Sequence, residues 1–185
     1  MSKLPLSTFQ KKYTHHINRD LSIHSFWNFF TERFGYELDF DVWLPSKQMN
    51  LQRPLVWTLT QKQQLLLSIL RDMRLPNFVA VQYATADTDR LLKIIDGKQR
   101  FNAVFQFFDG QYPIFVDDQQ YYFDDLADDA QKQIKFYIPR FDVHYHYGYD
   151  AADTITDDIM IDIFERVNFL GTPQDIEHLN NLKNR

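Results

Sequence analysis

The run Asp96-Gly97-Lys98-Gln99-Arg100 combines an acid, two bases, an amide and a glycine where the hydrophobic pattern of the chain changes. The mostly apolar stretch 91–95 before it predicts a strand, and apolar residues at helical spacing across 101–108 predict a helix after it. The free N–H groups and positive dipole end of a first helical turn attract phosphate. Lys98 and Arg100 add positive charge, so the run predicts a nucleotide-phosphate site.

The same run also has a purely structural interpretation. Asp96 can cap the helix N-terminus, and Gln99 stands at the spacing that completes a capping box. Lys98 and Arg100 are then ordinary surface residues. Because one glycine turn is a weak phosphate signal, the run by itself leaves both interpretations open.

Two other segments place an arginine and a neutral amide beside apolar residues. They are Leu51-Gln52-Arg53-Pro54-Leu55-Val56-Trp57 and Phe164-Glu165-Arg166-Val167-Asn168-Phe169-Leu170-Gly171-Thr172-Pro173. Arginine can form bidentate bonds to phosphate oxygens, and amides can add further hydrogen bonds. The side chains expected to converge on one polyanion are Gln52, Arg53, Arg100, Arg166 and Asn168.

In their order and spacing these segments resemble the DGQQR-motif domain, the N-terminal domain of GmrSD-type restriction enzymes. That family shows Q-R-x-x-x-W, a helix, a strand that leads into D-G-Q-Q-R, and later F-E-R-x-N followed by G-T-P. The chain has Gln52-Arg53 with Trp57, a predicted helix at 61–72, the run at 96–100, and the residues 164–173. The resemblance covers about residues 23–173 and implies a ParB/sulfiredoxin-like fold.

The chain departs from the family pattern at three places. Lys98 replaces a Gln, Phe101-Asn102 replaces Leu-Thr, and Phe169-Leu170 replaces a small polar Thr-Gly. An added lysine is compatible with phosphate binding. The bulkier Phe169-Leu170 pair would narrow the pocket, which bears on catalysis more than on fold.

The resemblance implies a nucleoside-triphosphate-binding domain, with Mg²⁺-dependent NTP hydrolysis in some members. It also implies a sensor or regulator in a phage-defence, restriction-modification or DNA-processing system. Carried over by motif, Asp96 and Arg100 are the catalytic residues, and Asp96 is the metal-binding or water-orienting carboxylate. The nucleotide-binding residues carried over in the same way are Gln52, Arg53, Gly97, Lys98, Gln99, Arg100, Arg166 and Asn168.

Enzymes of this family continue into a His-Asn-His nuclease half, and no convincing metal–nuclease cluster follows residue 173. The expectation is a stand-alone version, a trimmed piece, or a subunit whose nuclease or other effector lies on another chain. The alternative function is a non-catalytic module that binds a protein or DNA and retains the fold. A nuclease in its own right is a weaker third interpretation, because the net charge of -5 opposes strong DNA affinity.

Composition sets the outer limits of these interpretations. A length of 185 residues with 44% hydrophobic residues fits one domain with a substantial core. The absence of cysteine excludes disulfides, thiolate nucleophiles and Cys-based zinc or iron–sulfur sites. No apolar run approaches the roughly 20 residues of a membrane span, so we expect no membrane partner and a cytoplasmic location. The expected division is a solvated basic N-terminal segment at 1–22, a DGQQR-type domain at 23–173 and a polar tail at 174–185.

Periodicity and turn signals predict the elements that position the site. Helices are expected at 25–34, 60–73 and 157–168, capped by Ser25, Thr60 and Thr156, and from the Asp96-Gly97 turn to 108. Strands are expected at 78–83, 91–95 and 136–147, with short strands or a hairpin within 111–126 and helical turns at 128–135. The predicted fold class is α/β (α+β), a small mixed ParB/sulfiredoxin-like sheet with flanking helices.

Overall fold

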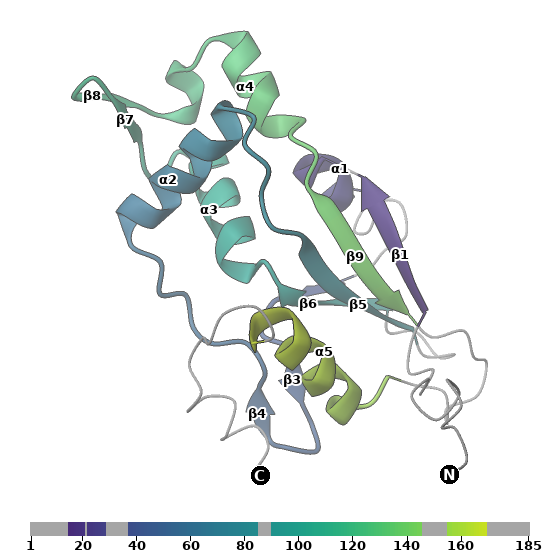
Figure 1. The fold of residues 1–185 in the computed structure, drawn as a ribbon. Coiled ribbons are helices and arrows are strands. Elements are labelled where there is room, and N and C mark those ends of the chain that lie inside the picture. The colour runs from purple at the N-terminus through teal and green to yellow at the C-terminus, as the bar shows by residue number, and fades with distance from the viewer. Residues whose placement is uncertain (1–14, 21, 29–36, 85–89, 146–154, 170–185) are drawn as a thin grey trace, which may run out of the picture.

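A five-stranded mixed sheet forms the middle layer of the protein, in the strand order β1-β9-β5-β6-β2 (Figure 1). The structure is a computed structural model and describes residues 15–20, 22–28, 37–84, 90–145 and 155–169. The strands in sheet order are β1 (His15–Asp20), β9 (Arg140–Tyr145), β5 (Phe78–Ala84), β6 (Arg90–Asp96) and β2 (Glu37–Asp39). The β1–β9 and β5–β6 pairs are antiparallel, whereas β5–β9 and β2–β6 are parallel. The prediction of a mixed α/β fold is confirmed.

Helices cover one face of this sheet, and a helix with a β-hairpin covers the other (Figure 1). The first face packs against α1 (Ile23–Asn28), α2 (Leu59–Leu70), α3 (Lys98–Phe108) and α4 (Asp128–Lys135). The second packs against α5 (Asp157–Phe169) and the pair β3 (Trp43–Leu44) and β4 (Met49–Asn50). Alternation along β5 explains the two layers, because Phe78 and Ala80 join the first core while Val79 and Val81 join the second.

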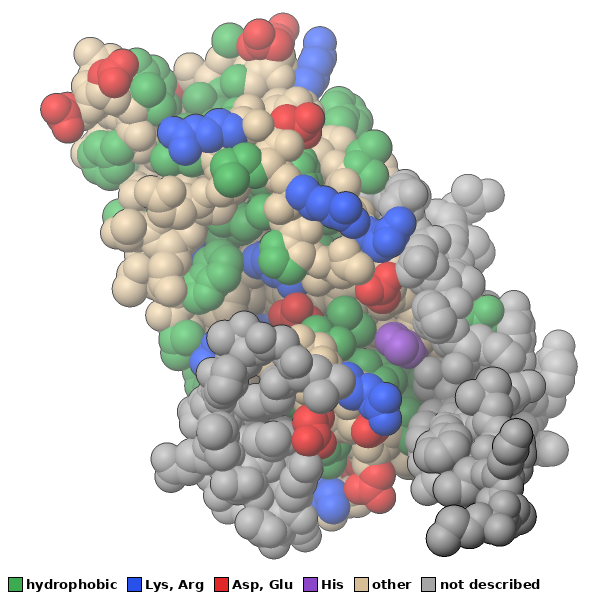
Figure 2. Space-filling view, viewed as in Figure 1, with side chains coloured by type: hydrophobic (Ala, Val, Ile, Leu, Met, Phe, Trp, Pro, Cys, Tyr) green, Lys and Arg blue, Asp and Glu red, His purple; other side chains and the backbone are tan. Residues whose placement is uncertain are grey.

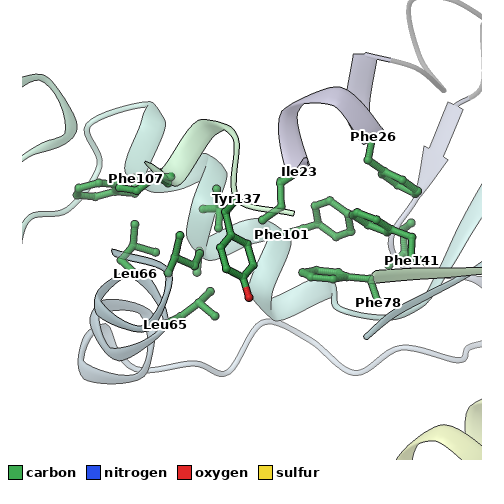
Figure 3. Close-up of a cluster of buried hydrophobic side chains, with 14 of the residues drawn as sticks. Ile23, Phe26, Leu65, Leu66, Phe78, Phe101, Phe107, Tyr137 and Phe141 are labelled. Atoms are coloured by element: carbon green, nitrogen blue, oxygen red, sulfur yellow. The ribbon is translucent and has the colours of Figure 1, made fainter. Parts of the chain in front are cut away.

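Aromatic rings fill the core between the sheet and α3 (Figure 3). The rings of Phe26 and Phe141 stack with centroids 3.8 Å apart, and those of Phe78 and Phe101 meet edge to face at 4.7 Å. All four side chains are fully buried. Phe101 lies in the first turn of α3, so this packing fixes the start of that helix against β5.

A small outlying layer consists of the hairpin β7 (Ile114–Val116) and β8 (Gln119–Tyr121) and the 3-10 turn η3 (Phe123–Asp125). Asp117 and Asp118 form the hairpin turn at φ 49° and 63°, a conformation that Asp tolerates. The prediction of a hairpin within 111–126 is confirmed, as are the helical turns at 128–135.

Two predicted helix starts are displaced. Thr58 and Gln61, and not Thr60 and Gln63, form the capping box of α2. Because α2 ends at Leu70, the predicted apolar position Met73 lies beyond the helix and is 53% exposed.

The first helix also begins earlier than predicted. The Ser22 hydroxyl accepts a hydrogen bond from the backbone N–H of Ser25 at 3.0 Å, so α1 begins at Ile23 and Ser22, not Ser25, is its cap. The rest of the predicted helix, residues 29–34, lies outside the described residues. The predicted cap of α5 is present, since Thr156 Oγ1 accepts from the N–H of Ile159 at 3.4 Å.

The ends of the chain differ from expectation where the structure describes them. Residues 15–20 of the segment expected to be solvated form β1, paired along its length with β9. Strand β9 begins only at Arg140, because Pro139 lacks the N–H group that a strand ladder needs.

Residues 1–14, 146–147 and the tail 174–185 lie outside the described residues. No helix in the described part of the chain is long and apolar enough to cross a membrane.

Candidate functional site

Gly97 alone makes the turn between β6 and α3. Its φ of +114° belongs to a region that L side chains rarely adopt, and a Cβ atom there would lie 2.2 Å from Cδ1 of Phe78. The backbone angle and the close approach therefore both require glycine. Gly97 is the N-cap of α3 and no side chain in the described residues caps that helix, so the predicted Asp96–Gln99 capping box is wrong.

Arg100 turns into the protein. Its exposed fraction is 7%, and its guanidinium carbon lies 4.2 Å from the ring centroid of Phe78. Nη2 donates to the backbone oxygen of Asn77 at 2.9 Å and to Oδ2 of Asp96 at 2.8 Å, and Nη1 donates to the backbone oxygen of Pro76. Burial lowers the pKa of Arg100, while the Asp96 carboxylate opposes that shift. The interpretation of Arg100 as a surface residue is therefore wrong, and the side chain positions the turn.

Two glutamine amides hold neighbouring segments against this turn. Gln99 Oε1 accepts from the N–H groups of Val56 and Trp57 at 3.1 and 3.3 Å, and its Nε2 donates to the oxygen of Pro54 at 2.9 Å. Gln52 Nε2 donates to the oxygen of Ile94 at 2.9 Å and also to that of Ile95. The predicted convergence of the 51–57 segment on the DGKQR turn is thus built from hydrogen bonds to the backbone.

A cavity of about 410 Å³ opens between the turn, the 52–57 segment, the α2–β5 connection and the last turns of α5. Its polar lining residues are Gln52, Arg53, Asp96, Gly97, Lys98, Gln99, Arg100 and Asn168. Its apolar lining residues are Trp57, Leu65, Leu75, Pro76, Phe164 and Val167. The polar residues could therefore bind a charged group of a ligand, and the apolar residues could contact a flat or apolar part of the same ligand.

Two cations, one exposed and one largely buried, lie at the polar part of the cavity. Arg53 is exposed. Lys98 Nζ forms an ion pair with Oδ1 of Asp41 at 2.5 Å. Both residues line the cavity, although the Lys98 side chain is only 11% exposed.

Of the two α5 residues that the motif assigned to the nucleotide site, one lines the cavity and the other does not. Asn168 lines the cavity, and its Nδ2 donates to the oxygen of Phe164 at 2.9 Å. Arg166 is exposed, pairs with Asp162 at 2.9 Å, and is not among the cavity-lining residues that the structure describes. The predicted narrowing of the pocket involves the side chain of Phe169 and the segment 170–173, which lie outside the described residues.

Sequence reasoning missed the contributions of Asp41, Leu75 and Pro76. In the sequence Pro76 indicated only the end of a helix, yet its carbonyl group accepts a hydrogen bond from Arg100 and the residue lines the cavity. Asp41 carries no motif that could have identified it as the partner of Lys98.

One carboxylate is placed to meet a cation in the cavity. Asp96 is the single acidic residue among the described cavity-lining residues, and its Oδ2 accepts from Arg100. Its Oδ1 has no hydrogen-bond partner among the described residues. No group of three or more His, Asp or Glu side chains able to hold a metal occurs in the parts of the chain that the structure describes. One free carboxylate oxygen fits Mg²⁺ held mainly by phosphate and water, which is the usual arrangement in nucleotide sites.

The sequence matches the family described as GmrSD restriction endonuclease, N-terminal domain, over residues 47–182. The match spans more than half of the chain and includes the 52–57 segment, the DGKQR turn and α5. The chain therefore belongs to this restriction-related family, as its motifs predicted. Comparisons with curated proteins and with solved structures found no significant match.

Proposed function

We propose that this domain binds a nucleoside triphosphate in the cavity at the DGKQR turn and acts as a nucleotide sensor in a restriction-related phage-defence system. The observation that carries the proposal is the two-part lining of the cavity. Arg53, Lys98 and the start of α3 lie at the polar part, and Trp57 and Val167 belong to the apolar part. The volume of about 410 Å³ lies within the range of about 300–1,000 Å³ typical of small-molecule sites.

The phosphates would bind where α3 begins. Gly97 leaves the first-turn N–H groups without a side-chain cap in the described structure, and the helix dipole adds a partial positive charge there. Arg53 supplies a fork of donors suited to phosphate oxygens. Lys98 would exchange its exposed partner Asp41 for phosphate. Arg100 also lines the cavity, and its hydrogen bonds to two backbone carbonyl groups and to Asp96 would hold the turn in place beneath the phosphates.

The base would bind against the apolar lining. Trp57 is half-buried, and its backbone N–H is held by Gln99, so the position of this residue is fixed by the same turn that receives the phosphates. An indole surface stacks on any nucleobase, with a gain of about 1–3 kcal/mol per stacked base. Trp57 is therefore the expected base platform.

Asp96 would carry the chemistry of hydrolysis if the domain turns over its ligand. Its free Oδ1 would hold Mg²⁺ or orient a water toward the terminal phosphorus, while Arg100 holds Oδ2 in place. Mg²⁺, when bound, neutralises phosphate charge as the bond between the terminal phosphorus and its bridging oxygen breaks.

A second candidate is a non-catalytic module that binds a protein or DNA. One observation favours it: the side chains of Gln52, Gln99 and Arg100 bind the chain's own backbone. On this interpretation the motif is retained because it holds three segments together. A nuclease or DNA would then be the partner that matters.

Binding of inorganic triphosphate and of ATP, GTP, CTP and UTP, each with and without Mg²⁺, separates these two candidates. The readouts are the melting temperature, since a ligand specific to the folded state raises it, and phosphate release. Arg53→Ala should weaken both inorganic triphosphate and the nucleotides by roughly 10- to 100-fold, the loss of about 1.5–3 kcal/mol for a charge-assisted bond. Trp57→Ala should weaken the nucleotides only.

Arg166→Ala is the matched control, because this arginine is exposed and lies outside the described lining of the cavity. It should leave every affinity unchanged. The absence of any melting shift with all five ligands would contradict nucleotide binding and favour the non-catalytic module.

A further inference from the structure

A second, larger cleft of about 690 Å³ lies between the α2–β5 connection and the α4–β9 connection. Its lining residues are Asp72, Arg74, Leu75, Asp129, Lys132, Gln133, Phe136, Tyr137, Ile138, Pro139 and Arg140. Apart from Leu75, none of them lines the first cavity. Neither the family match nor the nucleotide proposal gives this cleft a role.

Large apolar side chains are exposed at this cleft. Phe136 is 60% and Ile138 is 61% exposed, and both belong to the short connection between α4 and β9. Exposure of these two neighbouring apolar side chains to water is unfavourable in free energy. A partner that covered them would remove this cost. Lys and Arg side chains lie beside hydrophobic ones on the face of the molecule shown in Figure 2.

Three cations belong to the same cleft. Arg74, Lys132 and Arg140 line it, although the chain as a whole has a net charge of -5. Two acids, Asp72 and Asp129, share this lining and also line a neighbouring hollow beside Arg71. Exposed apolar side chains and cations therefore line the same cleft, and the cations outnumber the acids by three to two.

The walls of the cleft are held by internal hydrogen bonds. The Tyr137 hydroxyl donates to the oxygen of Met73 at 2.8 Å and accepts from the N–H of Leu75 at 2.9 Å. Gln133 Nε2 donates to the oxygen of Ile69 at 3.2 Å and to Oδ1 of Asp72 at 3.3 Å. Tyr137 itself lies among the core residues of Figure 3. A cleft preformed in this way costs a partner little ordering of the protein on binding.

We infer that this cleft docks a segment of a partner protein in which carboxylate side chains stand beside an apolar one. The apolar side chain would cover Phe136 and Ile138, and the carboxylates would meet Arg74 and Arg140. Interfaces of this kind bury aromatic and aliphatic side chains at the centre and place complementary charges at the rim. Duplex DNA fits less well, because a phosphate backbone would leave the exposed apolar side chains of the cleft uncovered.

The test is a fluorescence-anisotropy titration of the full chain with a short labelled peptide that alternates Glu with Leu and Phe. A second peptide with Lys in place of every Glu and a labelled DNA duplex serve as comparison ligands. The acidic peptide should bind saturably and the Lys peptide should not. Arg74→Glu combined with Arg140→Glu, and separately Phe136→Ser, should each weaken the acidic peptide by about tenfold or more. These side chains are exposed or lie at the protein surface, and thermal melts would verify that the variants remain folded.

Lys47→Glu is the charge-reversal control outside the cleft, because Lys47 pairs with Asp158 between the β3–β4 hairpin and α5. It should leave peptide affinity unchanged. No saturable binding at millimolar peptide, equal binding of the Lys peptide, or an equal loss in Lys47→Glu would each overturn the inference. DNA binding that depends on Arg74 and Arg140, with no peptide binding, would assign the cleft to nucleic acid instead. None of these outcomes depends on nucleotide binding at the DGKQR turn.

Discussion

Replacement of Arg100 should lower the stability of the domain before it has any effect on ligand chemistry. Arg100→Ala leaves the carbonyl groups of Pro76 and Asn77 and the carboxylate of Asp96 without the donor that the structure gives each of them. It also removes the guanidinium from the face of Phe78, where its carbon lies 4.2 Å from the ring centroid. The lost interactions connect β6, α3 and the α2–β5 connection, so no single element can compensate by a local adjustment.

The expected magnitude follows from burial. Removal of one partner from a fully buried ion pair costs about 3–5 kcal/mol, and because the Asp96 side chain is 31% exposed we expect the lower end of this range, about 3 kcal/mol. Arg100→Lys keeps the charge but offers one nitrogen to three acceptors. Because each hydrogen bond to a charged group contributes about 1.5–3 kcal/mol, we expect this variant to lose about 2–3 kcal/mol of unfolding free energy. Against a typical total of about 5–15 kcal/mol, the alanine variant loses a large share of its stability.

Urea unfolding followed by far-UV circular dichroism measures this effect, with an unchanged m-value as evidence for a two-state comparison. Arg166→Ala is the control, because its partner Asp162 lies one turn away on an exposed helix face, and such pairs contribute only about 0.3–0.5 kcal/mol. A loss below about 1 kcal/mol in Arg100→Ala would refute the structural role assigned to this residue. Loss of nucleotide turnover in that variant would not by itself identify a phosphate ligand.

Three further changes test the turn and the core. Gly97→Ala should cost at least about 1–3 kcal/mol of unfolding free energy, because it combines a positive φ with a clash against Phe78; a melting temperature equal to that of the wild type would contradict this. Gln99→Ala should speed hydrogen exchange at the backbone N–H of Trp57, and unchanged exchange there would show that the amide does not hold the segment. Phe101→Ala should cost about 3–5 kcal/mol in urea unfolding, as expected for a fully buried phenylalanine, whereas a loss under about 1 kcal/mol would mean that the core repacks around the cavity.

The strand–turn–helix around residue 97 could be predicted because its signals are local. The apolar pattern changes from continuous in β6 to helical spacing in α3, and Gly97 marks the point of change. The start of α2 could not be fixed in the same way, because Thr58 and Thr60 each have a glutamine at capping-box spacing. Only the packing of the folded chain selects Thr58.

The orientation of the site side chains could not be predicted. The sequence shows that Arg100 is charged and stands in a helix, but the carbonyl groups that it binds belong to a connection between other elements. Gln99 similarly binds a backbone segment far away in the sequence. The motif therefore predicted which residues come together, while the tertiary arrangement decides which of them face the cavity.

Strand β1 has a consequence for how the chain is made. It leaves the ribosome before the other described strands, and its one neighbour in the described sheet, β9, is the last of them to be synthesised. Such high contact order slows folding, and β1 must wait until nearly the whole domain has emerged before it can pair. A translational pause or a premature stop before residue 140 would therefore leave β5 without its parallel neighbour and β1 as an unpaired polypeptide edge. Limited proteolysis of stalled nascent chains should find residues 15–20 protected only after β9 has been completed.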